Sequence, residues 1–437
     1  MSKSILPSAV ILVALLEWQE RMIDFCQAQN LRIILLQPSK EEPYYWSDRV
    51  EQIVITDLTD EPNVLHHVKQ LAQTYHIVAI CTLYEYFVPL VAQLCATFHL
   101  PGLNPQGAQN CRHKKLTRQV LAQHRLASPQ HAVIKEIAEI ATALKQIPLP
   151  VIVKPSSDSG SAMVELCHAA AEVTIAVQAI LSQKKNRLGI PLDPTALIEA
   201  YIIGPEYSVE ACTIAGQTRI LTITEKTIYS EAKPFEVRHV VPAKLPTEQE
   251  QAIAELVTSV LTALSVDYSV THTEVRLTPQ GPFIIEVNAR PGGDMIAELV
   301  GAVKGHDLYE LALHISLGGR MDNLPQSQLQ TKTATTQYIY AEQSGVVFLN
   351  RPPKPLPSGV QTLSLYYRSG YLVRETTSNF GRLGYVIAHD TETHASPQVA
   401  QQAIDSLELH VKTDWPTVTK ARLIDMIYQI RTRLTGG

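Results

Sequence analysis

The first hundred residues alternate apolar runs with amphipathic stretches. Apolar runs at 9–16, 31–37, 51–57 and 76–82 predict buried strands, and the stretches between them have the apolar spacing of helices. Strands that alternate with helices form an open parallel sheet with helices on its faces. Because ligands of such sheets bind beyond the carboxyl ends of the strands, we expect Glu85, just after the fourth run, to lie near a ligand. A simple helix-starting acid is the alternative interpretation of Glu85.

A stricter alternation of polar and apolar residues marks residues 269–294. It predicts two strands joined by the turn TPQGP, in which Pro and Gly are the turn residues. Side chains alternate between the faces of a strand. On the second strand the expected apolar face therefore holds Phe283, Ile285 and Val287, and the opposite face holds Glu286 and Asn288.

The predicted hairpin contains a candidate metal site. If it is centred on Gln280, Glu274 lies directly opposite Glu286, with the two carboxylates about 5 Å apart. Like charges that face each other destabilise a sheet, so we expect a cation between them. Two carboxylates and the amide oxygen of Asn288 are hard ligands that suit Mg²⁺. Arg290 follows, where it could hold a phosphate or a carboxylate through two hydrogen bonds. An exposed hairpin with ordinary polar residues is the alternative.

Composition narrows the class of protein. The 437 residues are too many for one compact core, and 45% hydrophobic and 18% charged residues describe an ordinary globular protein. A net charge of −5 gives no basic footprint for nucleic acid. No apolar run approaches the roughly 20 residues of a membrane span, and 9–16 suits a buried strand better than a signal peptide. Six scattered cysteines without a CxxC pair predict buried thiols in a reducing compartment. We therefore expect a cytoplasmic protein without nucleic-acid or membrane partners.

Two segments in the middle of the chain suggest phosphate contacts. A basic helix begins near residue 111, although a solvated face is the favoured interpretation of each of its cations, which are Lys114, Lys115, Arg118 and Arg125. A buried strand then ends in Lys154, and a loop of small residues at 155–161 turns the chain into a strand at 162–166. Small residues there leave backbone N–H groups able to bind a phosphate oxygen. A flexible hairpin lid is compatible with this interpretation, and no Walker A sequence is present.

Further strands and helices complete the pattern. Residues 195–213 predict strand, turn and strand, with Glu199 ending the first strand. His239 is either a polar residue on an edge strand or an anion contact. A helix is expected over 247–263, two more at 295–300 and 307–316, and strands over much of 330–430, where Arg382 is a candidate structural anchor. A helix is expected to end the chain.

Four motifs in order resemble the ATP-grasp superfamily, and the resemblance covers about 10–430. They are KKLTRQVLAQHRL, VIVKP with its small-residue loop, IEAYIIGPEYSVE, and EVRL…FIIEVNARPGGD. The resemblance implies a mixed α/β fold with an N-terminal open parallel sheet, a small lid domain and a larger C-terminal antiparallel sheet. The expected division is an N-terminal domain at 1–112, a lid at 113–200, a catalytic and metal subdomain at 201–325 and a strand-rich subdomain at 326–437.

The superfamily resemblance also implies site residues by position. Lys114 and Lys154 would hold the α- and β-phosphates of ATP, with Ser161 in the lid over them, although His113 stands where an acid or amide is common. Glu206 would bind the ribose. The adenine would be held by main-chain groups of Glu199, Ala200, Tyr201 and Ile202. The metal, Mg²⁺ with Mn²⁺ as an alternative, would be held by Glu274, Glu286 and Asn288. His272 stands near where many relatives carry an arginine.

Within the superfamily the chain most resembles the L-amino-acid ligases, which form dipeptides. The resemblance rests on NARPGGD, LYEYFVPLVAQLCATFHLPGLNP and RLGYVIA. It implies that Glu85 contacts an ammonium group and that His239 and Arg290 contact a carboxylate and an acyl-phosphate. Asp294 would shape a pocket for a polar or basic group, or simply cap the next helix. The implied catalytic residues are Arg290, Glu274, Glu286 and His239.

The expected function is an ATP-dependent, ADP-forming ligase acting on a small-molecule carboxylate and an amine, with amino acids as substrates and a homodimer as the assembly. Three alternatives stay open at this point. They are a ligase of other carboxylates or amines, a bicarbonate-activating carboxylase, and a nucleotide-binding protein without ligase activity.

Overall fold

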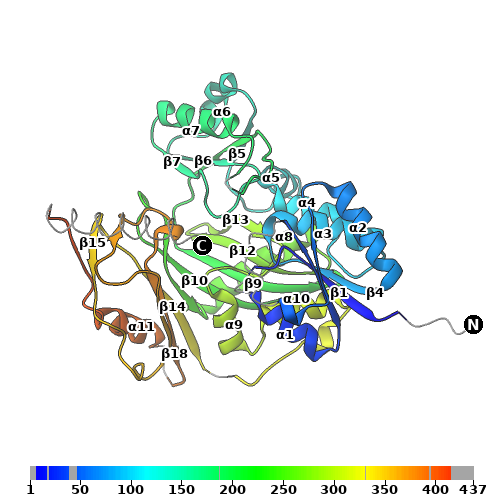
Figure 1. The fold of residues 1–437 in the computed structure, drawn as a ribbon. Coiled ribbons are helices and arrows are strands. Elements are labelled where there is room, and N and C mark those ends of the chain that lie inside the picture. Colours follow the sequence, from blue (N-terminus) through cyan, green and yellow to red (C-terminus); the bar gives the residue numbers. More distant parts are fainter. Residues whose placement is uncertain are drawn as a thin grey trace, which may run out of the picture. The chain divides into compact units, whose positions relative to one another are not determined.

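The chain folds into two compact units. The computed structural model describes residues 6–16, 19–38, 47–186, 188–329, 331–392 and 395–414. The first unit comprises Met1–Ile223, Leu245–Gly293 and Lys304–Ser327, and the second comprises Thr224–Lys244, Asp294–Val303 and Gln328–Gly437. Figure 1 labels many of the elements and colours the chain by residue number. The division into four domains stays a prediction.

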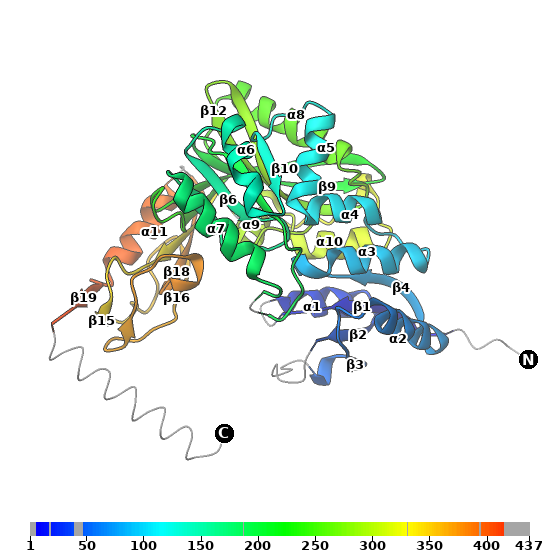
Figure 2. The ribbon, with the colours of Figure 1, turned by 90° about the horizontal axis from the view of Figure 1, so that it is seen from above.

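The first unit begins with the predicted parallel sheet. Its strands are β1 (Ser8–Val13), β2 (Arg32–Gln37), β3 (Gln52–Ile55) and β4 (His76–Cys81), in the order β3-β2-β1-β4 and all parallel. Between and after them lie α1 (Arg21–Ala28), α2 (Glu61–Thr74) and α3 (Val88–Thr97). Figure 2 shows these strands in blue. Continuous apolar strands are needed here because helices cover a parallel sheet on both faces, so the fold prediction for this region is confirmed.

A second, smaller sheet follows in the first unit. Its strands β5 (His131–Ile134), β6 (Val151–Pro155), β7 (Glu165–Cys167) and β8 (Ala196–Ala200) are antiparallel in the order β5-β8-β6-β7. Helices α6 (Ile140–Gln146) and α7 (Ala170–Ser182) share its apolar core. The predicted strand at 162–166 is wrong in its bounds. Gly160, Ser161 and Met163 have φ of 66°, 55° and 56°, which a strand does not allow.

The predicted basic helix is two helices. They are α4 (Pro105–Arg112) and α5 (Lys114–Gln123), and they are separated by His113, whose φ of −103° and ψ of 105° are extended. Lys114 therefore stands at the first position of a helix, where its side chain and its backbone N–H can serve different partners.

The first unit also holds strands in the order β13-β12-β9-β10. These are β9 (Glu206–Ile214), β10 (Gln217–Ile228), β12 (Ser269–Thr278) and β13 (Gly281–Asn288). Helix α8 (Thr247–Ala263) has the predicted bounds, and α10 (Leu308–Ser316) begins after Asp307, whose carboxylate accepts from the N–H groups of Tyr309 and Glu310. The chain passes from the first unit into the second within β10.

The predicted hairpin of β12 and β13 is present, but with a different turn. Thr278 pairs with Gly281, so the turn is two residues long and not centred on Gln280. A register shift follows between Glu274 and Val275, and Ile285 is the extra residue on β13. The bulge restores the predicted pairing of Glu274 with Glu286. It also corrects the predicted faces, because Ile284 is 0% exposed whereas Phe283 and Ile285 are partly exposed.

The second unit is strand-rich, as predicted. The end of β10 is followed in its sheet by β11 (Glu236–Val241), β14 (Thr333–Ile339), β18 (Gly384–Asp390) and β16 (Val360–Leu365). A small sheet has the order β17-β15-β19, formed by Leu372–Val373, Gly345–Phe348 and His410–Lys412. Helix α9 (Ile296–Lys304) packs its apolar face with Val241 and Ala334, and α11 (Ser396–Asp405) packs on β14 and β18. The predicted final helix lies outside the described residues.

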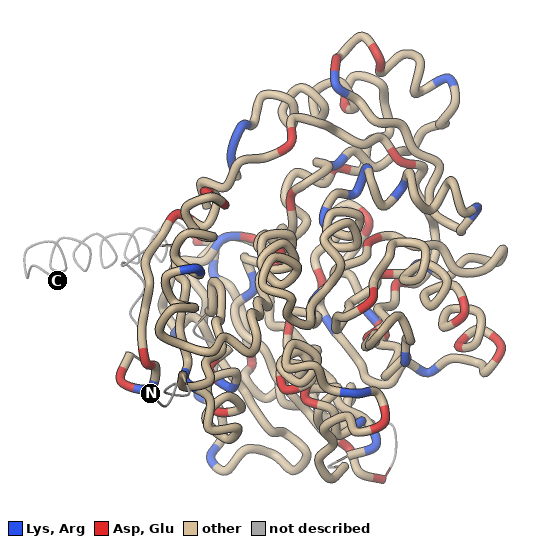
Figure 3. Tube along the Cα trace, turned by 90° about the vertical axis from the view of Figure 1, so that its right-hand side faces the viewer, with Lys and Arg blue, Asp and Glu red and all other residues tan. Residues whose placement is uncertain are grey.

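Three features of the composition can be described on the structure. All six cysteines are buried and free, as predicted. Acidic and basic positions are interspersed along the trace in Figure 3. Among the described residues, each helix is either too short or too polar to cross a membrane.

Candidate active site

The two carboxylates of the hairpin face each other across β12 and β13. Glu274 is the cross-strand partner of Glu286, so the predicted pairing is confirmed. Each carboxylate already touches one cationic side chain of the protein. Lys114 Nζ lies 3.2 Å from Glu286 Oε1, and His272 Nε2 lies 3.5 Å from Glu274 Oε1. The pair is thus balanced in charge from both ends, while both carboxylates remain partly exposed.

Asn288 provides a test of whether these residues fit a metal ion. One end of its amide lies 3.3 Å from Glu286 Oε1 and 3.2 Å from Glu85 Oε2. With the amide nitrogen turned toward them, Asn288 donates to both carboxylates. With the amide oxygen turned there, three oxygen atoms converge, and a hard cation is what would hold them together. Glu286 and Asn288 therefore fit a divalent metal together with Glu85, whereas Glu274 is connected to them only as the cross-strand partner of Glu286. A bound metal would decide the orientation of the amide.

A buried ion-pair triad lies beneath the candidate nucleotide site. Glu199 accepts from Arg118 Nε at 2.8 Å and pairs with Lys154 Nζ at 2.8 Å, and these three side chains are 2%, 1% and 4% exposed. Burial alone would raise the pKa of Glu199, but the two cations outweigh it and lower the pKa to about 2. Burial lowers the pKa of Lys154, and Glu199 opposes that shift. The triad ties α5 to β6 and β8.

The expectation that the basic helix is a solvated face is wrong for Lys114 and Arg118. Both side chains are buried, and Arg118 also donates to the carbonyl of Ile285 at 2.7 Å. Sequence reasoning missed Arg118. The available signal was its position four residues after Lys114, which places both cations on one face of the helix.

The predicted adenine segment is an extended connection between β8 and β9. Arg276 holds it in place, because its guanidinium donates to the carbonyl of Ile202 at 2.8 Å and to the carboxylate of Glu206 at 3.2 Å. The same guanidinium lies over the ring of Tyr201, 5.2 Å from its centroid. At Gly204 a Cβ atom would come within 2.1 Å of the Leu277 carbonyl, so the close approach of the two backbones requires glycine. Arg276 is a second residue whose role the sequence did not reveal.

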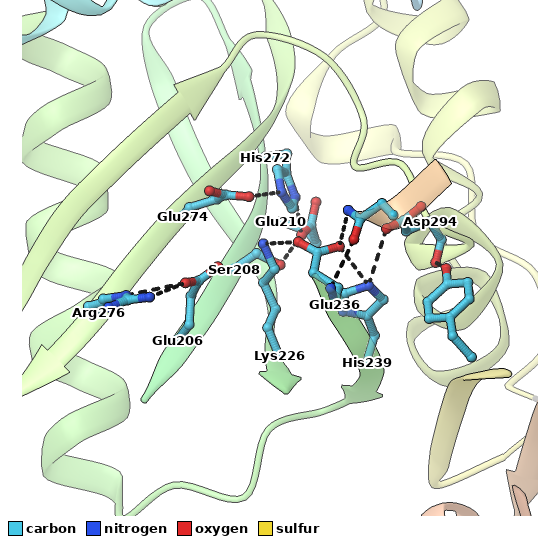
Figure 4. Close-up of polar contacts among 12 residues, drawn as sticks. Glu206, Ser208, Glu210, Lys226, Glu236, His239, His272, Glu274, Arg276 and Asp294 are labelled. Atoms are coloured by element: carbon cyan, nitrogen blue, oxygen red, sulfur yellow. Dashed lines mark hydrogen bonds and ion pairs between the residues drawn. The ribbon is translucent and has the colours of Figure 1, made fainter. Parts of the chain in front are cut away.

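His272 is held by a chain of polar groups on neighbouring strands. Its Nδ1 lies 2.8 Å from Glu210 Oε1, and the Ser208 hydroxyl donates to the same oxygen at 2.8 Å, as Figure 4 shows. Burial would lower the pKa of His272, but Glu210 and Glu274 raise it to about 9. A cationic imidazole is therefore favoured at His272.

Two predicted substrate residues meet in the first unit. Glu85 begins a short 3-10 turn after β4, and its carboxylate lies 2.9 Å from Arg290 Nε, which follows β13. The side chain of Glu85 is buried. Glu85 thus begins a helical turn, as the alternative interpretation of a helix-starting acid predicted. Its carboxylate also forms an ion pair with Arg290.

In the second unit, His239 lies within a cluster of ionised side chains. It is 0% exposed on β11, which pairs with β10 and β14, so the edge-strand interpretation is wrong. Its Nε2 lies 3.3 Å from Glu236 and 3.7 Å from Asp294, and Glu236 pairs with Lys226 at 2.7 Å (Figure 4). Burial would lower the pKa of His239, and Asp294 and Glu236 raise it instead. A cationic imidazole is therefore favoured.

Asp294 is bound by Arg382 in the same cluster. Two nitrogen atoms of the guanidinium lie 2.8 and 3.1 Å from its carboxylate oxygens. Burial would raise the pKa of Asp294, but its bonds to the cluster hold it well below the usual range. Arg382 also lies over the ring of Tyr338, 3.6 Å from its centroid, and so acts as the predicted anchor. Within the part of the chain that the structure describes, the hydrogen bonds to the Asp294 carboxylate come from Arg382, and not from the backbone of α9 as a cap would require. The charge of Asp294 is thus compensated by Arg382, and the role of Asp294 beside a polar or basic substrate group stays a prediction.

Comparison with known proteins places the chain in a family. Residues 27–102 match the ATP-grasp N-terminal domain family, and residues 147–298 match the ATP-grasp domain family. Over 370 residues the chain is 30% identical to the uncharacterized protein y4rH of Sinorhizobium fredii, with 84% of this chain and 74% of the relative covered. The chain belongs to the ATP-grasp family.

More distant relatives bear on the kind of ATP-grasp protein. The alanine–anticapsin ligase of Bacillus subtilis is 24% identical, over 62% of this chain and 60% of its own length. The crystal structure of the L-amino acid ligase from Bacillus licheniformis has a TM-score of 0.76 at 23% identity, covering 94% of this chain and all of that one. The predicted resemblance to the amino-acid ligases of this family, the ATP-grasp fold and the prediction of an ATP-grasp ligase are confirmed. The roles of single side chains stay predictions.

Proposed function

We propose that this ATP-grasp ligase joins the carboxylate of one amino acid to an amine, in particular that of a second amino acid, with ADP and phosphate as products. The observation that carries the proposal is the position of Asn288. Its amide contacts Glu85 at 3.2 Å and Glu286 at 3.3 Å. An acid paired with an arginine suits the ammonium and carboxylate of an amino acid, and here that pair adjoins the opposed carboxylates.

The first unit supplies the proposed nucleotide site. Lys114 and Lys154 would contact the phosphates, with Ser161 in the loop over them, and Glu206 would contact the ribose. Main-chain groups of residues 199–202 would hold the adenine. The buried triad of Glu199 supports this assignment, because it fixes Lys154 and the end of β8 in one arrangement before any ligand binds.

The opposed carboxylates form the proposed metal site. Glu274, Glu286 and Asn288 would hold Mg²⁺, or Mn²⁺ in its place. Such an ion, when bound, would neutralise charge on the transferring phosphoryl group. Lys114, which already touches Glu286, adds a cation of the protein itself to that neutralisation.

The proposed reaction has two steps. In the first, a carboxylate oxygen of the substrate attacks the γ-phosphorus of ATP, the bond from that phosphorus to the bridging β-phosphate oxygen breaks, and ADP leaves while an acyl-phosphate forms. In the second, the neutral amine nitrogen attacks the acyl carbon, the bond from that carbon to the phosphate oxygen breaks, and phosphate leaves together with the proton that the nitrogen loses. Arg290 would stabilise the oxyanion of the tetrahedral intermediate. His239 keeps the role of an anion contact that the family resemblance implies, and its raised pKa supports a cationic form.

The test is release of phosphate and ADP from MgATP with all pairs of common amino acids and mass detection of products. A product with the mass of two substrates minus water, together with ADP and not AMP, would establish the proposal and identify the substrates. Turnover with bicarbonate alone, or only with other carboxylates or amines, would replace it. Size measurement in solution would test the predicted homodimer.

Arg290→Lys should raise KM for the carboxylate substrate about ten- to a hundredfold, while nucleotide affinity stays within about twofold. Lysine keeps the charge but loses the planar pair of donors, and the bond to Glu85 is weakened. Initial rates over a range of each substrate would separate the two effects. Arg320→Lys is the matched control, because that side chain is exposed beside Asp322. An unchanged KM for every amino acid would exclude Arg290 from the substrate site.

A further inference from the structure

The loop that follows β6 is bound to the start of α5 through its own carbonyl groups. The backbone N–H of Lys114 donates to the Ser156 carbonyl at 2.9 Å, and the guanidinium of Arg112 donates to the Ser157 carbonyl. The ammonium group of Lys114 donates to the Asp158 carbonyl at 2.8 Å. Three successive carbonyl groups of the loop therefore accept hydrogen bonds from Arg112 and Lys114. Lys114 is one of the proposed phosphate ligands.

The same loop is also tied to the segment of Glu85. The hydroxyl of Tyr86 donates to Asp158 Oδ1 at 2.5 Å, and the backbone N–H of Ser159 donates to the same atom at 2.9 Å. The carboxylate is nearly enclosed, since Asp158 is 4% exposed. Arg112 holds Tyr86 from the other side, with its guanidinium 4.7 Å from the ring centroid. A short hydrogen bond from a hydroxyl to a buried carboxylate is among the stronger contacts that a loop can make.

Tyr86 and Asp158, which form this hydrogen bond, each lie next to residues of a proposed ligand site. Tyr86 follows Glu85, whose carboxylate contacts Arg290 and the amide of Asn288. The ammonium group of Lys114 contacts both Asp158 and Glu286. It donates to the Asp158 carbonyl and lies 3.2 Å from Glu286 Oε1. A phosphate that reaches Lys114 would share its ammonium group, which has three N–H donors, with these two acceptors. The segment of Glu85 and the loop are therefore joined by the Tyr86–Asp158 hydrogen bond and by Arg112, which contacts both.

We propose that Tyr86 and Asp158 are positioning residues that couple occupation of the amino-acid site to closure of the loop over the phosphates. The inference rests on the proposed function. An amino acid bound at Glu85 fixes the segment of Tyr86, and the Tyr86 hydroxyl then holds the loop by Asp158. The closed loop keeps water from the acyl-phosphate, so ATP is consumed only when amide can form.

Tyr86→Phe and Asp158→Asn should each lower the amide formed per ADP about two- to tenfold, as the loss of one hydrogen bond predicts. ADP formation without amino acids should rise correspondingly, and KM for the amino acid should rise more than KM for ATP. The double variant should match Tyr86→Phe, because that variant already lacks the donating hydroxyl, whereas Asp158→Asn keeps an accepting oxygen and only weakens the bond. Tyr371→Phe, an exposed tyrosine, is the control and should keep the wild-type ratio.

The outcomes separate this inference from the proposed function. If the wild-type protein forms amide and both variants keep its ratio of amide to ADP, the coupling is wrong while the ligase proposal stands. If the wild-type protein forms no amide with any pair, the proposed function fails and the coupling fails with it. Equal loss of activity and thermal stability in both variants, at an unchanged ratio, would leave a purely structural role and overturn the coupling.

Discussion

Glu286→Gln is expected to reduce ADP formation by on the order of 10³-fold, because preorganised charge at a phosphoryl-transfer site is among the largest contributions to catalysis. Glu286 faces Glu274 across the hairpin, lies 3.2 Å from Lys114 Nζ and adjoins the amide of Asn288. Glutamine keeps the shape but removes the charge that attracts a divalent ion and anchors Lys114. Both proposed cations of the site would therefore be displaced together.

The fold of this variant should survive. Glu286 is partly exposed and faces a like charge, so the free energy of unfolding should change by no more than about 1 kcal/mol. Chemical denaturation would show this, and titration of nucleotide affinity with Mg²⁺ would show a weakened dependence on the metal. Glu255→Gln, an exposed acid on α8, should leave turnover unchanged. Near-normal turnover of Glu286→Gln would remove the hairpin from the catalytic site.

Local pattern predicted the hairpin well because its determinants are local. Alternation of polar and apolar residues identified both strands, and the pairing of Glu274 with Glu286 was predicted. That pairing arises from two features that the pattern did not reveal, a two-residue turn and a bulge at Ile285. A bulge shifts the register by one residue, and alternation alone cannot distinguish it from a longer turn. Because the bulge was not predicted, the apolar face of the second strand was predicted incorrectly. Ile284, and not Ile285, is buried in the core.

The electrostatic partners of the site were much harder to predict. Arg118 and Glu199 are 81 positions apart, and Arg382 and Asp294 are 88 apart. A basic helix is a solvated face in most settings, and only the tertiary arrangement makes Arg118 a buried counter-ion. In the same way, the pairing of Asp294 with Arg382 could not be read from the sequence. Sequence revealed which residues carry charge, and the fold determines which of those charges remain available to a ligand.

Glu199→Gln should lower the free energy of unfolding by about 3–5 kcal/mol, because it leaves Arg118 and Lys154 buried without their counter-charge. Breaking a buried ion pair from one side costs far more than the pair itself contributes. Urea denaturation at pH 7 would measure the change. Glu51→Gln is the matched control, since Glu51 pairs with Arg32 at 2.9 Å on the exposed edge of the first sheet, and its loss should cost less than about 1 kcal/mol.

The pH dependence gives this prediction a second, independent readout. Arg118 and Lys154 lower the folded-state pKa of Glu199 to about 2, against the effect of burial. The carboxylate therefore stabilises the fold above its unfolded pKa of about 4.3, and that contribution is lost as the pH falls toward 2. A protonated glutamate resembles glutamine, so the difference between wild type and Glu199→Gln should be constant from pH 5 to 7 and should narrow below about pH 4. A difference that stayed the same down to pH 2 would show that packing, and not charge, accounts for the loss.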